Sequence, residues 1–503
     1  IKGAVLGVGA TLLAALPAVR EAVMAPPRAT LVRSLGEDRV RRLVPRAALS
    51  GAALFATGLV VLAVPSRSVG LSFAGLFGVL IGAALITPLA TVAFVRLLTP
   101  ILSRTVGILG TMAARGVVAA LSRTAPATAA LVIAVSVTVG LGVMIQSFRS
   151  TVVAWLDHTL QADIYVSPPS PVSSRAEGSL DPALIARLRA VPEVDGVSTY
   201  RGAEVTTEWG VQRLVALDLD PRGEAAFRFL EGEAERAIAA FRGAGAVLVS
   251  EPFAWRSGLT VGDSVPLPTD RGVRRFAVAG VFQDYGSEQG VIMMARATWD
   301  GVMDDPRITS LGIFLAEGTP TEPVVAALQA AAAAEGAAAL EGAASLEGAA
   351  GAGQTAPALG VVIRSNAELR RTSLEVFDRT FAITAVLRAL AFVVAFIGVL
   401  AALMALQLER AREFGVLRTN GLTPRQLWVM VTTQTGLLGV VAGLLAVPLG
   451  LVLAVVMIDV VNKRSFGWTL GMEVGADVLL QAVGLAVAGA LLAGLYPAWR
   501  MSR

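Results

Sequence analysis

Residues 409–428 form a short charged segment between two long apolar runs, and this arrangement constrains the fold more than any other feature. The flanking runs, residues 380–408 and 427–458, are each long enough to cross a bilayer, which needs about 20 apolar residues. The charged segment must therefore be a tight loop on one face of a membrane. The positive-inside rule places that face in the cytoplasm, because the loop is rich in arginine. These arginines include Arg410, Arg412, Arg418 and Arg425.

Within this loop the sequence predicts a short helix over residues 410–419, with Phe414 and Leu417 three residues apart on one side. Asn420-Gly421 is expected to end this helix, since glycine accepts the left-handed conformation of a C-terminal cap. Thr423-Pro424 then restarts a helix, with threonine as the N-cap and proline at the first helical position. We therefore expect a small helix that lies across the cytoplasmic ends of two spans, within residues 410–425.

The same loop resembles the coupling helix of FtsX-like permeases, the membrane subunits of the MacB and LolC/LolE class of ABC transporters. The matching runs are Arg-x-x-Glu-Phe-Gly-Val-Leu-Arg from Arg410 and Gly-Leu-Thr-Pro-Arg-Gln-Leu from Gly421. In that family the loop docks into a cleft of the ATPase subunit, so the resemblance implies a set of ATPase-coupling residues. These are Arg410, Glu413, Phe414, Gly415, Leu417, Arg418, Gly421 and Arg425. The simpler alternative, a basic loop that only sets topology, does not require the Gly-Leu-Thr-Pro restart.

Composition excludes several classes of function. The 503 residues are 55% hydrophobic and 16% charged, as in a multi-span membrane protein with a sizeable soluble part. The chain has no cysteine and a single histidine, His158, so it has neither a disulfide framework nor a His- or Cys-rich zinc signature. It also lacks the interleaved basic and aromatic residues typical of nucleic-acid binding. We expect no metal and no nucleic-acid partner.

Catalytic motifs are absent as well. The only lysines, Lys2 and Lys463, lack the glycine frame of a phosphate-binding loop, and there is no Gly-x-Ser-x-Gly nucleophile elbow. The sequence therefore predicts that the chain is not an enzyme by itself and binds no cofactor. Any ATP and magnesium would be bound by a separate ATPase chain.

The two ends of the chain repeat each other. Residues 12–20 read Leu-Leu-Ala-Ala-Leu-Pro-Ala-Val-Arg, and residues 491–500 give a similar run with a one-residue offset. An internal repeat of this kind predicts two related units, of which the first is incomplete. We interpret residues 1–20 as the last transmembrane helix of an incomplete first FtsX-like unit. The rest of that unit would form an N-terminal half that this chain lacks.

The remaining membrane segments follow from the alternation of arginine-rich and apolar stretches. We expect a cytoplasmic linker at residues 21–45, a transmembrane hairpin at 46–98, and a cytoplasmic amphipathic segment along the membrane surface at 99–125. The second FtsX-like unit would begin with a transmembrane helix at 126–148. It would end with three more transmembrane helices, together with the coupling helix, within 380–503. The total is seven membrane spans.

Residues 156–371 are polar and carry alternating strand and turn signals, which predict a mixed α/β domain outside the cytoplasm. We expect a strand at residues 194–207 and a helix at 224–241. Residues 326–353 are rich in alanine and glycine, and we interpret them as a flexible surface insertion. Residues 257–282 resemble the periplasmic domain of MacB-type permeases, where Gly-Leu-x-Val-Gly-Asp precedes a strand.

The predicted fold is therefore an α-helical integral membrane protein with a mixed α/β, MacB-type periplasmic domain. The resemblance implies a multi-pass permease in a bacterial inner (cytoplasmic) membrane, driven by a separate ABC ATPase dimer. Its cargo would be a lipid or another hydrophobic molecule, and its further partners would be membrane lipids and a periplasmic accessory protein or hydrolase. The alternative is a transmembrane regulator that transports nothing and controls a periplasmic hydrolase.

Overall fold

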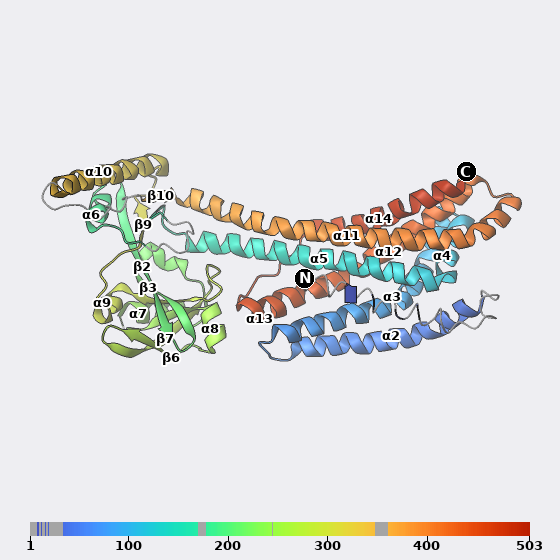
Figure 1. Cartoon of the computed structure of the whole chain (residues 1–503), viewed down its shortest axis with the longest axis horizontal. Helices are drawn as coiled ribbons and strands as arrows, with labels where there is room; N and C mark the ends of the chain where they lie inside the picture. The colour runs from blue at the N-terminus through green and yellow to red at the C-terminus, as the bar shows by residue number, and fades with distance from the viewer. Residues whose placement is uncertain are drawn as a thin grey trace.

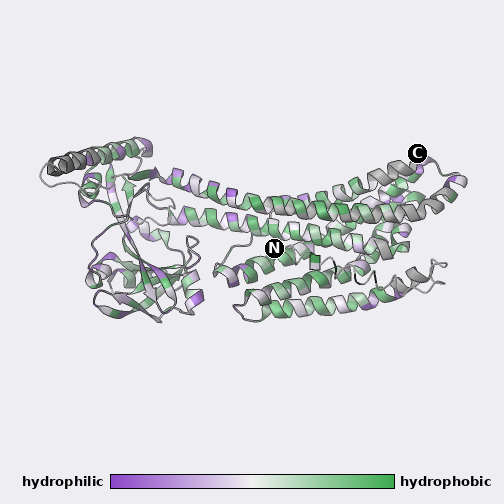
Figure 2. Cartoon of the chain, viewed as in Figure 1, coloured by the Kyte–Doolittle hydropathy of each residue, from purple (hydrophilic) through white to green (hydrophobic). Residues whose placement is uncertain are grey.

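The computed structural model shows an elongated molecule, with a bundle of long helices at one end and an α/β domain at the other (Figure 1). The structure describes residues 34–169, 178–243, 245–347 and 361–502, together with five isolated residues near the start of the chain. Hydrophobic residues dominate the middle of the bundle, whereas both ends of the molecule are more polar (Figure 2). This distribution is the one that a bilayer around the bundle requires.

The bundle contains nine helical elements in the described residues. They are α2 (Ser34–Ala63), α3 (Val69–Thr105), α4 (Ile108–Ala119), α5 (Leu121–Thr159), α11 (Asn366–Thr419), α12 (Pro424–Val455), η3 (Val456–Asn462), α13 (Lys463–Phe466) and α14 (Ala476–Ser502).

Five of the seven expected spans appear as helices long and apolar enough to cross a membrane. They are Arg42–Ala63, Val69–Thr105, Thr124–Thr159, Pro424–Phe466 and Ala476–Gly494. The expected span at residues 380–408 lies inside α11, many of whose side chains are outside the described residues. The expected span at residues 1–20 and the linker at 21–45 lie largely outside the described residues as well.

Close approach of two backbones holds α2 against α3. A Cβ atom on Gly82 of α3 would lie 2.6 Å from the backbone nitrogen of Phe55 and 2.7 Å from the carbonyl oxygen of Gly51, both on α2. Only glycine fits at this position, as at the small-residue interfaces common between membrane helices. The expected hairpin is therefore a tightly packed helix pair.

The predicted amphipathic segment is divided among α3, α4 and the start of α5. Residues 99–105 continue α3, and α4 packs against the start of α12. Ala113 of α4 is 1% exposed and packs with Leu427 and Val431 of α12. One side of α4 therefore has a protein partner, and its position along a membrane surface stays a prediction.

The longest helix, α11, also corrects a prediction. It runs without interruption for 54 residues, from Asn366 to Thr419, so no separate short helix spans residues 410–419. The predicted boundary between the span and a separate short helix lies where apolar residues are followed by charged ones. However, Gln407, Glu409 and Arg410 are good helix formers, and no glycine or proline separates them from the span.

The α/β domain is built on a ten-stranded sheet between α5 and α11. In the order of the sheet, the strands are β10, β1, β9, β2, β3, β8, β5, β7 and β4, with β6 paired to β7. Their bounds are β1 (Ile164–Ser167), β2 (Val194–Thr207), β3 (Gly210–Asp218), β4 (Phe229–Glu231), β5 (Val247–Ser250), β6 (Ser264–Thr269), β7 (Gly272–Phe282), β8 (Val291–Ala295), β9 (Ser310–Leu315) and β10 (Val362–Ser365).

Short helices cover the sheet and connect its strands. They are α6 (Pro182–Arg189), η2 (Pro221–Ala226), α7 (Ala234–Gly243), α8 (Glu251–Ser257), α9 (Arg296–Val302) and α10 (Thr321–Glu347). The strands β3 and β8, and likewise β5 and β7, are parallel, whereas the other pairs are antiparallel. The strand predicted at residues 194–207 is confirmed with the same bounds.

One prediction in this domain was wrong. The single helix expected at residues 224–241 is divided into η2, β4 and α7, because Gly232 adopts a φ of 95° that no continuous helix allows. The tract interpreted as a flexible insertion is helical as far as Glu347, because α10 extends through it, and its flexibility stays a prediction. Alanine and glutamate favour helix, and Val324 and Leu328 anchor the helix in the core of the domain. Residues 348–353 lie outside the described residues.

Candidate functional site

The eight predicted coupling residues lie at the turn between α11 and α12. Six of them, Arg410, Glu413, Phe414, Gly415, Leu417 and Arg418, are in the last turns of α11. Gly421 is in the turn itself, and Arg425 is in the first turn of α12. The side chains at positions 410, 413–415 and 417 are outside the described residues, so the predicted pairing of Phe414 with Leu417 stays a prediction.

The chain reverses at Asn420-Gly421, as the sequence predicts. Gly421 adopts a φ of 93°, and its N–H donates to the carbonyl oxygen of Arg418 at 3.1 Å. The N–H of Asn420 donates to the carbonyl oxygen of Val416 at 3.1 Å. Free carbonyl groups at the end of α11 are thereby satisfied, and the helix stops within one residue of Thr419.

The start of α12 is fixed by a reciprocal cap. The N–H of Gln426 donates to the hydroxyl of Thr423 at 3.3 Å, and the N–H of Thr423 donates to Oε1 of Gln426 at 2.9 Å. Pro424 occupies the first turn, where its missing N–H has no cost. The predicted restart at Thr423-Pro424 is confirmed, and the direction of α12 is set by the turn itself.

This end of the molecule presents an open basic surface. Arg418 and Arg425 are exposed, and Trp428 is 39% exposed although it follows Leu427, which is only 1% exposed. Pro424, Arg425, Trp428 and Val429 line a hollow of about 570 Å³. Trp428 was not among the predicted site residues. Its signal in the sequence is an aromatic residue in the first turns of α12, close to Arg425.

At the opposite end, α5 and α11 enter the α/β domain side by side. The amide of Asn366 donates to the carbonyl oxygens of Leu160 at 2.7 Å and Ala162 at 3.0 Å, which ties the first residue of α11 to the end of α5. Arg370 forms an ion pair with Asp157 at 2.7 Å. The two helices therefore meet β1 and β10 as one unit (Figure 1).

A third connection runs from the loop before α14 to the α/β domain. Thr469 donates its N–H to Oε2 of Glu251 at 3.0 Å, and its hydroxyl donates to the same carboxylate. Tyr285 donates its hydroxyl to the carbonyl oxygen of Thr469 at 2.5 Å. Burial raises the pKa of the Glu251 carboxyl, against the lowering effect of the bonds from Thr469. Nothing in the sequence pattern joins residues 251, 285 and 469.

The helix pair α2–α3 is fastened at the same junction. Arg464 of the α13 segment donates to the carbonyl oxygens of Leu62 and Val64, each at 2.7 Å, and so caps the end of α2. Arg67, in the turn between α2 and α3, donates to the carbonyl oxygen of Arg256 in α8 at 3.1 Å. The hairpin is thus attached to both the bundle and the α/β domain.

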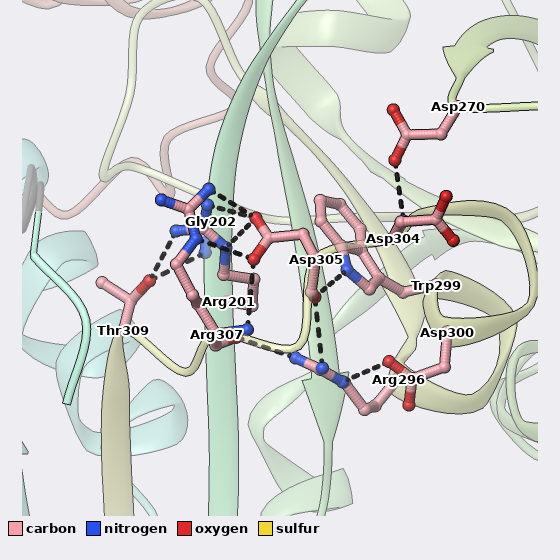
Figure 3. Close-up of polar contacts among 10 residues, drawn as sticks. All are labelled: Arg201, Gly202, Asp270, Arg296, Trp299, Asp300, Asp304, Asp305, Arg307 and Thr309. Carbon is pink, nitrogen blue, oxygen red and sulfur yellow. Dashed lines mark hydrogen bonds and ion pairs between the residues drawn. The ribbon is translucent and has the colours of Figure 1, made fainter. Parts of the chain in front are cut away.

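Within the α/β domain, Asp305 is the centre of a polar network (Figure 3). Its carboxylate accepts from Arg307 at 2.8 Å and from Arg201 at 2.9 Å, and its carbonyl oxygen accepts from the indole N–H of Trp299 at 2.9 Å. The hydrogen bond from Arg307, followed by that from Arg201, holds the pKa of Asp305 well below its usual range despite burial. The network joins β2 to the segment that precedes β9.

No group of three or more His, Cys, Asp or Glu side chains could hold a metal ion in the part of the chain that the structure describes. The site is therefore built from hydrogen bonds, ion pairs and helix geometry. Its parts are a turn at one end of α11 and a three-way junction at the other.

Comparison with known proteins agrees with this arrangement. The model of the FtsX-like permease C-terminal domain matches residues 385–503, and that of the MacB-like periplasmic core domain matches residues 124–331. The ABC transporter permease protein Rv0987 of Mycobacterium tuberculosis (strain ATCC 25618 / H37Rv) is 39% identical over 507 residues. That alignment covers 100% of this chain and 57% of the relative, so the chain spans little more than half of the relative's length.

Two solved structures are similar to the α/β domain. The periplasmic region of MacB from Actinobacillus actinomycetemcomitans is 13% identical, with a TM-score of 0.28, and the match covers 43% of this chain and 94% of that one. The extracellular domain of the transporter YknZ from Gram-positive bacteria is 12% identical, with a TM-score of 0.24, and covers 32% of this chain and 87% of that one.

The chain belongs to the FtsX-like ABC transporter permeases with a MacB-like periplasmic core domain. It is a membrane permease whose α/β domain is extracytoplasmic. The predicted family and fold class are confirmed.

Proposed function

We propose that this chain transmits the ATP-driven motion of a separate ABC ATPase dimer to its extracytoplasmic domain. The observation that carries this proposal is the continuity of α11, which runs for 54 residues from β10 to the turn at Asn420-Gly421. At about 1.5 Å per residue, this helix is about 80 Å long. A displacement at its cytoplasmic end therefore reaches the α/β domain without passing through a flexible joint.

The capped turn supports the same proposal. Because Gly421 and the Thr423–Gln426 cap fix the angle between α11 and α12, a partner that pushes on the turn moves both helices together. Phe414 and Leu417 would supply the apolar contact with the ATPase, and each could contribute about 1.5–3 kcal/mol if buried. Glu413, Arg410, Arg418 and Arg425 would form charge-assisted bonds at the rim of the contact.

The proposed complex contains further parts. An N-terminal FtsX-like half would pair with this unit, ATP and magnesium would be bound by the ATPase, and lipids of a bacterial cytoplasmic membrane would surround the bundle. The proposed cargo is a lipid or another hydrophobic molecule that leaves the outer leaflet. A periplasmic accessory protein would receive it.

Replacing Leu417 by Asp tests the coupling. The change puts a charge where an apolar contact is proposed, so we expect loss of ATPase co-purification, or loss of ATPase stimulation by at least about tenfold. The residue lies beyond the apolar stretch of α11, so membrane insertion should persist. Both quantities are measured for the permease co-expressed with its N-terminal half and its ATPase.

Val273→Asp is the matched control, because Val273 is an aliphatic residue of the α/β domain that is 73% exposed. It should leave ATPase association unchanged. If Leu417→Asp bound the ATPase and stimulated it as the wild type does, residues 410–425 would be a loop that only sets membrane topology. Intact coupling without ATP-dependent release of a labelled lipid would favour a regulator that transports nothing.

A further inference from the structure

The α/β domain contains a cavity of about 240 Å³ that the coupling residues do not touch. It lies between one face of the sheet and a cover formed by η2 and the last turns of α5. Strands β1, β2, β3, β8 and β9 contribute its floor. Its volume is slightly below the range of about 300–1,000 Å³ that is usual for ligand pockets, and so suits a slender ligand.

The walls of this cavity are mostly apolar. They include the side chains of Leu217, Phe227, Phe282, Met293 and Phe314. On the floor, Tyr165, Gly312 and Ser198 are paired across three neighbouring strands. Gly312 has no side chain there, and a Cβ atom at its position would lie 3.9 Å from the ring of Tyr165 and 3.0 Å from Cβ of Ala162. Because Gly312 has no side chain, no atom of this residue extends from the sheet into the cavity.

One end of the cavity carries a carboxyl group. Oδ1 of Asp284 accepts the N–H of Gly286 at 3.0 Å. Burial raises the pKa of Asp284 to about 6, although the bond from Gly286 and the nearby charge of Arg213 lower it. A carboxyl group in such surroundings has a high desolvation cost, which a ligand that donates a hydrogen bond would reduce.

This carboxyl group lies on the side of the cavity where Trp155 is found. A Cβ atom on Gly286 would lie 3.2 Å from Oδ1 of Asp284 and 3.6 Å from the indole ring of Trp155. Trp155 also lines a second cavity, of about 620 Å³, between the end of α5 and residues 469–473. Ala226 and Gln283 line both cavities as well, so the two spaces are adjacent at these residues. Residues of α5, together with residues within 226–230 and 469–473, line the second cavity, so it lies where the bundle meets the α/β domain.

We propose that the inner cavity binds a single alkyl chain whose hydroxyl or ammonium headgroup stays against Asp284 and Trp155. The chain enters from the membrane side through the junction cavity and lies along Phe227, Met293 and Phe314. Anionic headgroups are rejected by the carboxylate. This inference deepens the proposed function, on which it rests for the membrane as the source of the ligand.

Photolabelling of the intact chain in lipid nanodiscs tests the site, without ATP or ATPase. The probes are three alkyl chains of equal length with a diazirine near the methyl end, carrying a primary alcohol, a primary amine or a carboxylate. We expect the alcohol and the amine to label residues of the inner cavity, identified by mass spectrometry, and the carboxylate to label them about tenfold less.

Two neighbouring alanines give a matched pair of variants. Ala226→Phe places a ring where the two cavities are adjacent and should reduce labelling about tenfold. Ala225→Phe adds the same ring at an exposed position of η2 that lines neither cavity, and should leave labelling unchanged. Asp284→Asn should abolish the preference for the amine probe over the carboxylate probe. The alcohol probe should still label this variant, which would show that the variant is folded and has lost only the charge.

Three results would each overturn the proposal. They are equal labelling by the three headgroups, undiminished labelling of Ala226→Phe, and adducts found only on the membrane helices. The outcome is also distinguishable from failure of the proposed function. A wild-type chain that couples to ATPase but is not labelled contradicts only the site. A labelled chain that never couples contradicts only the proposed transmission.

Discussion

At the scale of single residues, Asp305 shows how much of the α/β domain depends on one buried carboxylate. Asp305 is 17% exposed and Arg201, which donates to it, is 11% exposed. A second donor, Arg307, is 60% exposed and can return to water when the carboxylate is removed. Arg201 cannot, so the cost of removing Asp305 is mainly the cost of a buried cation that keeps Thr309 as an acceptor but has lost its counter-charge.

We expect Asp305→Asn to lower the local stability of β2 and of residues 303–309 by roughly 2–4 kcal/mol at neutral pH. The folded-state pKa of Asp305 is depressed, so its contribution is complete above the unfolded pKa of about 4 and is lost as the pH falls below it. The difference between variant and wild type should therefore shrink at acidic pH. Hydrogen exchange of these segments, corrected for the intrinsic rate at each pH, measures it.

Asp304→Asn is the control for this prediction, because the neighbouring Asp304 is 77% exposed and its ion pair with Arg271 is long, at 4.0 Å. Its effect should be within about 0.5 kcal/mol of zero. Equal exchange in both variants would mean that the network around Asp305 is not what holds β2 to the segment before β9.

At the scale of elements, the α2–α3 pair relies on shape rather than on polar contacts. Its closest approach is at Gly82, where the α2 backbone occupies the space that a side chain would need. Membrane helices gain little from apolar burial against each other, because lipid is equally apolar, so packing at short distance is the main source of their association.

We expect Gly82→Val to separate α2 from α3, because its Cβ alone would lie 2.6 Å from the backbone nitrogen of Phe55. Gly484→Val is the matched control in α14, where no other atom lies within 4 Å of the added Cβ. Disulfide cross-linking between one cysteine introduced in α2 and one on the facing side of α3 measures the separation. It should fall sharply in Gly82→Val only, and unchanged cross-linking would show that the pair adjusts without separating.

At the scale of the whole molecule, α11 connects the turn at Asn420-Gly421 to the extracytoplasmic sheet. The outer ends of α5 and α11 are joined by Asn366 and by the Arg370–Asp157 pair, while α12 reaches the same sheet through Thr469, Glu251 and Tyr285. Three helices of the bundle thus meet one rigid sheet. A domain held at three points can tilt as a body when the helices shift against one another.

This arrangement predicts the orientation of the chain in the membrane. Because the chain has no cysteine, single cysteines at Val273 and Thr419 report the two faces without background. We expect a membrane-impermeant maleimide to label Val273→Cys in intact spheroplasts, and Thr419→Cys only after permeabilisation. Labelling of both from outside would contradict the orientation that the arginines indicate.

The sequence predicted those features whose cause is local. Gly421 and Thr423-Pro424 specify the turn through their own backbone preferences, and β2 was predicted with its final bounds because its pattern and flanking turns are local as well. Prediction failed where two local rules, the change in polarity and the helix propensity, indicated different helix ends. Helix propensity continued α11 through the change from apolar to charged residues.

The sequence by itself therefore determined the membrane class, the family, the position of the large domain in the chain, and the residues at which one helix ends and the next begins around Gly421. Each of these depends on residues within a few turns of one another. Only the tertiary structure decided that α4 packs on α12, that Thr469 bonds to Glu251, and that Trp155 and Asp284 border one cavity with Phe314. These residues are far apart in the chain, and their contacts depend on how sheet and helices pack, which no local pattern records.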